Sequence, residues 1–529
     1  MRLLMLISLL CFFAMSYSQK NSNPYINKSI IKIHSSNEDL IPHLLDLNVI
    51  PMSCRGAILE SNLIVDSATV RFLQSNKIAF SFISHNCSKL IDQEMRQIDN
   101  IKKKRNSNWY STYRNLNEID DYTTVITEGS DIASKIVIGQ TFEGRDLSLV
   151  KIAADTLVKN KPAIFINGCQ HAREWITPMA TMYVIEELIT QYSNNSEVND
   201  LLNLIDIYVL PVANPDGYAY TWDKDRWWRK NRQPNIGSEC VGTDLNRNWN
   251  YDWNGNQSTS DDPCSYIYVG AAPFSALETQ IISDYLLTIP NLVNHIDVHN
   301  YSALIVGPWS SSDEPTEDND EVFCLGTRMQ AKVSNTNNYP YIFGTGTVNG
   351  LLYLISGGMV DWVYASLSSL SFLYELRPAS LYYFNSDFDG LAAFDNDIAE
   401  ILPACEEFYQ GVFEMIKWAS LDECQVPTGC SDPDADNYYC NTSEGNMGCL
   451  YNVDIYNPPQ SNGAYNLVEY SLPLGFIDDG SCIYSSSISS QNIPKKIIKT
   501  VDLLGREETK SRFSIHIYDT GVVEKKYIY

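Results

Sequence analysis

Residues 163–175 read AIFINGCQHAREW, an apolar run that passes directly into a histidine and a glutamate. The apolar residues Ala163 to Ile166 predict a buried strand, and His171 and Glu174 follow it within one loop. Ligand sites of open α/β sheets lie just outside the carboxyl ends of their strands. The stretch therefore predicts both an α/β fold and the place of a functional site.

Two later segments repeat this arrangement. Leu292 to Val298 is a strand candidate that runs into His299, and Ser371 to Tyr374 is one that runs into Glu375. Amphipathic segments lie between the strand candidates, as in an α/β domain. We expect a central sheet that is mixed and mostly parallel, flanked by helices.

Two of the expected helices have recognisable starts. Thr177 is expected to cap a helix that has Pro178 at its first position, and Ser275 to Glu278 has the pattern of a capping box. A long amphipathic helix, from about Asp397 to Trp418, closes the domain.

Three of the residues that follow strands are potential metal ligands. His171, Glu174 and His299 offer two imidazoles and one carboxylate. A catalytic zinc needs three protein ligands and an open position for water, whereas a structural zinc is closed by four. The His-x-x-Glu pair alone is a weak signal, because the chain holds seven histidines and many acidic residues. Together with the third ligand it predicts one catalytic Zn²⁺.

The composition excludes several classes of protein. The chain has 529 residues, 44% of them hydrophobic, which is enough for a large core and several folding units. Its 38 basic and 64 acidic side chains give a net charge of −26, which repels nucleic acid and anionic lipid. No stretch after the N-terminus is long and apolar enough to cross a membrane. We therefore expect neither a nucleic-acid partner nor a transmembrane segment.

The N-terminus has the parts of a secretory signal peptide. Arg2 precedes the apolar run Leu3 to Met15, and Ser16 to Ser18 follow as a cleavage site. We assign residues 1–18 to this signal and expect a secreted, extracellular protein. The chain has 13 cysteines, and removal of the signal with Cys11 leaves 12. An even number of cysteines in an exported protein favours disulfides over free thiols.

The rest of the chain divides into five segments. Residues 19–105 have the pattern of a small α+β unit that ends in the basic run Lys102 to Arg105. This run is either a processing site for a trypsin-like protease or a solvated charged stretch. The α/β domain occupies residues 106–421. A Cys-rich module (422–484), a Ser-rich linker (485–494) and a β-rich tail (495–529) follow it.

A series of short motifs in the α/β domain matches one protein family. In chain order the motifs are Thr141–Arg145, His171–Trp175, Asn214–Tyr218, Asp225–Lys230, Asp244–Trp249, His299–Ser302, Ser356–Gly358 with Asp361–Trp362, and Glu375–Arg377. With this series the domain resembles the zinc carboxypeptidases of the pancreatic A/B type, the M14 family. The resemblance implies the carboxypeptidase fold, with residues 19–105 in the place of the family's activation segment.

The resemblance also implies catalytic roles. The three ligand candidates would bind the zinc, and Glu375 would be the general base that activates the zinc-bound water. Arg229 would polarise the scissile carbonyl and stabilise the oxyanion, and Asp244 would orient His171. A carboxylate beside a zinc-bound water is chemically suited to take its proton and return it to the leaving amine.

Further residues would bind the substrate. A terminal carboxylate calls for a bidentate guanidinium and a neutral donor, and Arg247 beside Asn246 fits that need. By resemblance, Tyr353 would swing over the bound residue, Arg173 would contact the residue upstream, and Tyr301 would belong to the same substrate-binding set.

The specificity pocket is expected to be apolar. Its floor position is Val360, where members that prefer Lys or Arg carry an acidic residue, and the other matching positions, Val348, Ile355 and Leu373, are not basic. This pattern predicts A-type specificity for apolar terminal residues.

The cysteines of the domain carry two further expectations. The resemblance implies a disulfide between Cys240 and Cys264. Cys169, two residues before a zinc ligand, departs from the family pattern, and we favour a packed or bridged cysteine over a fourth ligand.

The leading hypothesis is an active secreted metallocarboxypeptidase, acting as a monomer on the C-termini of peptides and proteins. The alternatives are a peptide-binding pseudoenzyme and a cell-wall peptide hydrolase on the same fold. The Cys-rich module resembles repeats of bacterial surface proteins. The tail resembles C-terminal sorting domains of the type IX secretion pathway, which would attach the protein to the cell surface.

Overall fold

The computed structural model describes residues 23–35, 37, 40–47, 49–52, 62–104, 108–256, 258–346, 354–378 and 398–421, with short strand segments between 428 and 527. The chain divides into two units, one of residues 1–433 with 438–481, and one of residues 434–437 with 482–529. The signal segment, the Ser-rich linker and the cysteines of the Cys-rich module lie outside the described residues.

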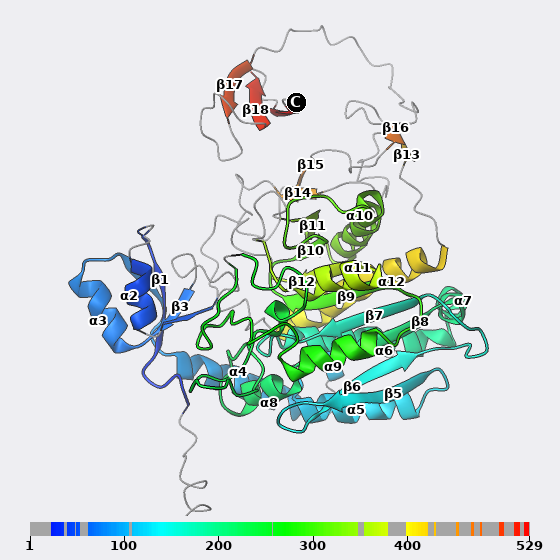
Figure 1. Ribbon diagram of the computed structural model, residues 1–529, viewed down its shortest axis with the longest axis horizontal. Coiled ribbons are helices and arrows are strands. Elements are labelled where there is room, and N and C mark those ends of the chain that lie inside the picture. Colours follow the sequence, from blue (N-terminus) through cyan, green and yellow to red (C-terminus); the bar gives the residue numbers. More distant parts are fainter. Residues whose placement is uncertain are drawn as a thin grey trace, which may run out of the picture. The chain divides into compact units, whose positions relative to one another are not determined.

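An eight-stranded sheet forms the centre of the first unit (Figure 1). Its order is β11-β10-β12-β9-β7-β8-β6-β5. The strands are β5 (Ala133–Gln140), β6 (Asp146–Ile152), β7 (Ala163–Gly168), β8 (Asp206–Leu210), β9 (Leu292–Asn300), β10 (Leu304–Gly307), β11 (Ile342–Thr345) and β12 (Leu370–Leu376). The pairs β8–β7, β7–β9, β9–β12 and β10–β11 are parallel, and the other three are antiparallel. The sheet is therefore mixed and mostly parallel, which confirms the expected fold class.

The central strands are buried on both faces, as their continuous apolar runs predict. Ile164 and Ile166 of β7 pack in one cluster, whereas Ala163 and Phe165 pack in another on the opposite face. The register of β9 against β12 sets His299 beside Glu375. Strand pairing thus brings together two residues that lie far apart in the sequence.

Helices cover both faces of the sheet. They are α5 (Leu116–Glu128), α6 (Ile176–Tyr192), α7 (Ser196–Leu204), α8 (Pro215–Asp223), α9 (Leu277–Leu286), α10 (Asn319–Thr336), α11 (Met359–Leu367) and α12 (Ile401–Leu421), with short 3₁₀ turns at Trp109–Ser111, Leu245–Arg247 and Ile398–Glu400. Residues of α6, α10 and α12 pack in the first cluster, and residues of α9 and α11 pack in the second.

The expected helix caps were wrong. Helix α6 begins at Ile176 with Trp175 at the cap position, and the Thr177 hydroxyl donates to the Glu174 carbonyl from inside the first turn. Helix α9 begins after Ala276, and the Ser275 hydroxyl accepts a hydrogen bond from the Asn248 amide instead. Both side chains make bonds outside their own helix, which local patterns do not reveal.

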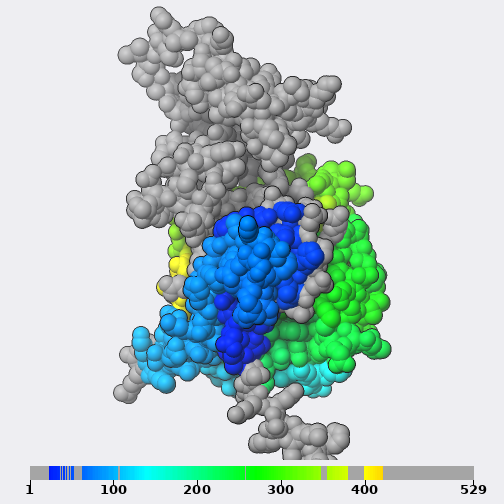
Figure 2. Space-filling view, turned by 90° about the vertical axis from the view of Figure 1, so that its left-hand side faces the viewer, coloured from blue at the N-terminus to red at the C-terminus, as the bar shows by residue number. Residues whose placement is uncertain are grey.

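The N-terminal part of the first unit is a separate antiparallel sheet with helices. Strands β1 (Ser29–Ile33), β2 (Ile50–Pro51), β3 (Asn62–Val65) and β4 (Phe80–Ser84) pair in the order β2-β3-β1-β4. They are joined by α2 (Leu40–Asp46) and α3 (Ser67–Ser75), and α4 (Cys87–Lys102) follows them. Figure 2 shows this part in blue on the face toward the viewer. Arg105, the expected cleavage point, lies outside the described residues.

Beyond α12 only short strands are described. Strand β13 (Thr428–Gly429) pairs with β16 (Ile477–Asp478), and β14 (Tyr451–Val453) pairs with β15 (Leu467–Glu469). In the second unit, β17 (Ile497–Val501), β18 (Phe513–Tyr518) and β19 (Val523–Tyr527) form an antiparallel sheet. Within the described residues, no helix has the length and apolar character that crossing a bilayer requires.

Candidate metal centre

Three ligand residues converge at the carboxyl ends of β7 and β9. His171 and Glu174 lie in the turn between β7 and α6, and His299 is the last but one residue of β9. Their ligand atoms all lie within 4.8 Å of one another, and all three residues are buried. The Nδ1 atoms of the two histidines are 3.0 Å apart, and Glu174 Oε1 lies 2.9 Å from His171 Nδ1.

These atoms fit a zinc ion. Two imidazole nitrogens that face each other at 3.0 Å, with a carboxylate beside them, need a cation or a proton between them. The set of two histidines and one glutamate is a donor set of catalytic zinc sites. His171, Glu174 and His299 therefore form the zinc site of the chain.

Carboxylates lie behind both imidazoles. Asp244 Oδ1 lies 3.1 Å from His171 Nε2, and its Oδ2 accepts from Nε and Nη2 of Arg229 at 3.0 and 2.9 Å. Burial alone would raise the pKa of Asp244, but Arg229 and His171 outweigh burial and hold that pKa well below its usual range. On the other side, Asp297 Oδ2 lies 2.8 Å from His299 Nε2.

Glu375 lies beside the ligands on β12. It is partly buried, and its Oε2 atom is fully buried without a hydrogen-bond partner among the described residues. Burial raises the pKa of Glu375 to about 8. A carboxylate in such surroundings is suited to exchange a proton with a substrate or a water.

The structure buries the three predicted arginines near this site. Arg173, Arg229 and Arg247 are each 1% exposed, so none is a solvated surface charge. Arg247 donates from Nε to the Ser258 carbonyl at 2.9 Å and from Nη1 to the Asn246 carbonyl at 2.6 Å.

Asn246 joins Arg247 to the zinc ligand His299. Its Oδ1 accepts from the Met359 backbone N–H at 3.0 Å, and its Nδ2 lies 3.1 Å from His299 Nε2. The predicted substrate-binding residues Arg247 and Asn246 therefore lie beside the predicted metal ligands.

The remaining predicted residues are placed as follows. Val360 is buried in a small apolar cluster. Tyr301 is half-buried and packs against a cluster that includes Tyr25 and Trp227. Tyr353 and Val348 lie outside the described residues.

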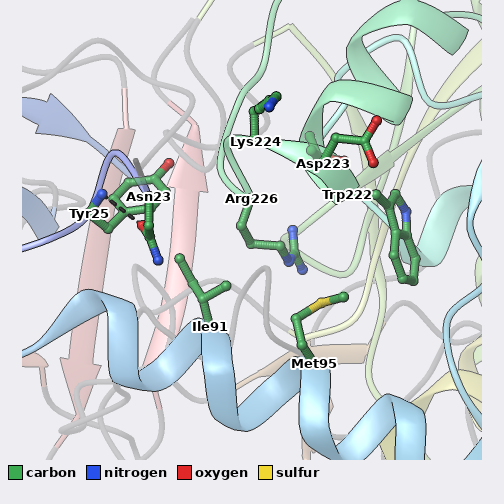
Figure 3. Close-up of a pocket in the computed structure, with 9 residues that line it drawn as sticks. Asn23, Tyr25, Ile91, Met95, Trp222, Asp223, Lys224 and Arg226 are labelled. Atoms are coloured by element: carbon green, nitrogen blue, oxygen red, sulfur yellow. Dashed lines mark hydrogen bonds between the residues drawn. The ribbon is translucent and has the colours of Figure 1, made fainter. Parts of the chain in front are cut away.

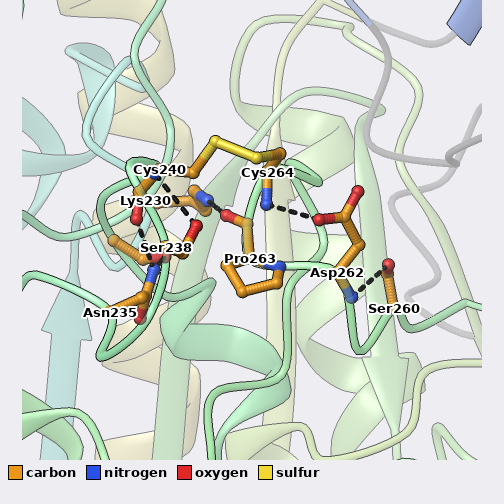
Figure 4. The surroundings of a disulfide bond; sticks show 9 residues. Lys230, Asn235, Ser238, Cys240, Ser260, Asp262, Pro263 and Cys264 are labelled. Atoms are coloured by element: carbon orange, nitrogen blue, oxygen red, sulfur yellow. Dashed lines mark hydrogen bonds between the residues drawn. A yellow bond between two sulfur atoms is a disulfide. The ribbon is translucent and has the colours of Figure 1, made fainter. Parts of the chain in front are cut away.

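Cys240 and Cys264 form a disulfide across 24 residues (Figure 4). Beside it, Lys230 Nζ donates to the Pro263 carbonyl at 2.6 Å. The bridge thus links the segment that carries Arg229 to the loop before α9. Cys169 is buried and forms no disulfide. Its thiol donates to the His171 carbonyl at 3.6 Å, and Cys169 is not part of the ligand cluster. It is therefore a packed cysteine.

Asp297 was not among the site residues predicted from the sequence. One signal was present, because residues two apart on a strand share a face and Asp297 precedes His299 by two. This spacing predicts that Asp297 and His299 lie on the same face of the sheet, but it does not predict that their side chains are in contact.

Comparison with known proteins agrees with this geometry. The pattern of the family described as zinc carboxypeptidase (peptidase family M14) matches residues 119–410. Carboxypeptidase A4 of Mus musculus is 32% identical over 64% of this chain and 79% of its own length. Carboxypeptidase B of Homo sapiens is 34% identical over 60% of this chain and 75% of its own length.

A solved structure is similar as well. The crystal structure of thrombin activatable fibrinolysis inhibitor matches with a TM-score of 0.64 and 28% identity, over 75% of this chain and all of that chain. The family pattern covers more than half of the chain, and it includes all three zinc ligands. The chain therefore belongs to the zinc carboxypeptidase family.

Proposed function

We propose that this carboxypeptidase prefers apolar C-terminal residues. The observation that carries the proposal is the cluster around the expected pocket floor. Leu304, Val306, Ile355, Val360 and Leu373 are all buried there, with Ile342 packed against them. A charged terminal side chain in such surroundings would lose its hydration without gaining a partner.

The bulk of two cluster members sets the size of the preferred residue. Ile355 and Leu373 fill space beside Val360, and both are nearly inaccessible to solvent. Each CH₂ group that a terminal side chain buries there contributes about 0.8 kcal/mol to binding. We expect Leu, Met, Val and Phe to be released well, Trp less well, and charged residues hardly at all.

The chemistry follows from the residues around the site. A zinc ion held by His171, Glu174 and His299 would polarise the scissile carbonyl and make a water more acidic. Glu375 takes a proton from the attacking water at its carboxylate and returns it to the leaving nitrogen. Arg229, oriented by Asp244, stabilises the charge that develops on the carbonyl oxygen. Arg247 and Asn246 hold the terminal carboxylate of the peptide.

The pocket assignment is tested with peptides that differ only in the final residue. The wild type should have a higher kcat/KM for terminal Leu than for terminal Arg. Val360→Asp should reverse this order, because it adds a counter-charge at the floor of the pocket. The uncharged Val360→Asn should lower both kcat/KM values without reversing their order. A wild type that prefers terminal Arg would refute the pocket assignment.

We also propose that residues 19–105 restrain the enzyme until cleavage near Arg105. Contacts between this segment and the catalytic domain support the proposal. The Tyr25 ring lies 4.6 Å from the Trp227 ring and its hydroxyl donates to Asp225. Glu94 of α4 accepts from Arg226 at 2.8 and 3.0 Å.

The residues that contact the N-terminal segment are close to the active site in the sequence and in the structure. Trp227 lies two residues before Arg229, and Arg226 Nη1 donates to the Arg173 carbonyl at 3.0 Å. Between α4 and residues 221–226 a cavity of about 190 Å³ remains, lined by Ile91, Met95 and Trp222 among others (Figure 3). Elsewhere along α4 the interface is packed, because Ile98 is buried in the main cluster of the catalytic domain and Lys102 pairs with Glu118 at 2.5 Å.

Mild trypsin treatment of the full-length protein tests the restraint. Activity should rise as residues 19–105 are released. Full activity before cleavage would make the segment a folding aid instead.

For the flanking segments we propose secretion by the N-terminal signal and export through the tail from residue 495. The protein would act as a monomer on peptide and protein C-termini. Normal export of a tail-less protein by its native host would contradict the role of the tail.

A further inference from the structure

The second zinc histidine has an outer partner on its own strand. Asp297 Oδ2 lies 2.8 Å from His299 Nε2, on the side of the ring away from the other ligands. Asp297 is fully buried, as is Asp244 behind His171. We propose that Asp297 is a positioning residue, which fixes the ring and the tautomer of His299 so that Nδ1 is presented to the metal.

The partners of Asp297 leave it only the role of acceptor. Asn167 Nδ2 donates to its Oδ1 at 2.6 Å, and Gln170 Nε2 donates to its Oδ2 at 2.6 Å. Both oxygens therefore already accept hydrogen bonds, so the hydrogen between Asp297 and His299 belongs to the imidazole. A hydrogen on Nε2 leaves the lone pair on Nδ1, which is the atom that faces His171 and Glu174.

A second contact at Nε2 favours the other tautomer of His299, with the lone pair on Nε2. Asn246 Nδ2, itself a donor, lies 3.1 Å from His299 Nε2. The contact to Asp297 is shorter and involves a charged acceptor, and hydrogen bonds of that kind are roughly twice as strong as neutral ones. With its lone pair on Nε2, the ring would face the carboxylate with no hydrogen between them. Asp297 therefore decides the tautomer.

The sheet itself holds Asp297 in place. Asn167 Oδ1 lies 2.8 Å from His295 Nε2, and His295 Nδ1 lies 2.7 Å from Ser371 Oγ. This buried chain of polar groups joins β7, β9 and β12 beneath the zinc site. A carboxylate anchored on three paired strands is better fixed than one on a loop.

Zinc affinity is the direct test. Zinc is removed from the full-length protein and titrated back in competition with a chromogenic chelator. Asp297→Asn keeps the shape but loses the charge and one acceptor, and it should weaken zinc binding by about 10–100-fold. Asp216→Asn is the matched control, because Asp216 is also fully buried and accepts from Thr141, Glu143 and Arg145. It should leave zinc affinity unchanged.

The melting temperature separates positioning from general support. Without zinc, both variants should melt below the wild type, since each loses buried hydrogen bonds. Added zinc should raise the melting temperature of Asp216→Asn as much as that of the wild type, but that of Asp297→Asn by less. If Asp297→Asn does not fold, Gln170→Leu removes one donor to the carboxylate and should weaken zinc binding several-fold.

Two results would overturn the proposal. One is a zinc dissociation constant for Asp297→Asn, or for Gln170→Leu in its place, within twofold of the wild type. The other is a large loss in Asn246→Ala with none in Asp297→Asn, which would assign the tautomer to Asn246. A wild type that binds no zinc would refute the metal site itself, and this outcome is distinct from both.

Discussion

Glu278 of α9 should make the protein lose stability as the pH rises. The residue is fully buried, its Oε2 accepts from Asn231 Nδ2 at 2.6 Å, and its Oε1 has no hydrogen-bond partner among the described residues. Burial raises the pKa of Glu278 from 4.5 to about 7. Between these values the folded protein keeps a proton that the unfolded chain has lost.

The size of the effect follows from this difference in pKa. Each pKa unit corresponds to about 1.4 kcal/mol, so the folded state loses up to roughly 3 kcal/mol as the pH rises from 4.5 through 7. Below pH 4.5 the carboxyl is protonated in both states and the contribution is fully present. Glu278→Gln is neutral at every pH and keeps an acceptor for Asn231, so it should not show the loss.

Urea unfolding at pH 5, 6, 7 and 8 provides the assay. The variant should match the wild type within about 1 kcal/mol at pH 5 and exceed its stability by up to roughly 3 kcal/mol at pH 8. Glu128→Gln, on the exposed end of α5, is the control and should follow the wild type at every pH. An equal pH dependence in Glu278→Gln and the wild type would refute the argument.

Other predictions concern the site and its restraint. Glu375→Gln should keep its zinc content but lose at least about 100-fold in kcat, since it has no base to take the proton; retained turnover would remove Glu375 from the mechanism. Glu94→Gln should raise activity before trypsin treatment about tenfold or more, because removing the carboxylate that pairs with buried Arg226 costs about 2–5 kcal/mol of docking energy, and unchanged latency would count against this contact. Leu373→Ala should widen the pocket and raise the kcat/KM for terminal Trp relative to terminal Val; an unchanged ratio would place the side chain elsewhere.

The fold class and the metal ligands were predictable from the sequence. His171 follows the apolar strand β7, His299 lies near the end of β9, and parallel strands end at the same edge of a sheet. The family motifs then named the ligands, because the chemistry requires fixed residue types at fixed spacing.

Non-local contacts were not predictable. Glu94 pairs with Arg226 across 132 residues, and Asp297 accepts from Asn167 across 130, with no sequence pattern to connect either pair. The cap expected at Ser275 failed for the same reason, since the Ser275 hydroxyl bonds to Asn248 rather than to helix α9. Local patterns report which element forms, whereas these contacts depend on how elements pack.

The central claim is that this chain removes single C-terminal residues with a zinc ion held by His171, Glu174 and His299. The most direct test incubates trypsin-treated protein, stripped of metal and then restored with one equivalent of zinc, with a peptide ending in Leu-Leu. Mass spectrometry should show stepwise loss of single leucines with zinc and none without it, and His299→Ala should show none in either case. Internal cleavage, or release that is unaffected by metal removal, would contradict the account.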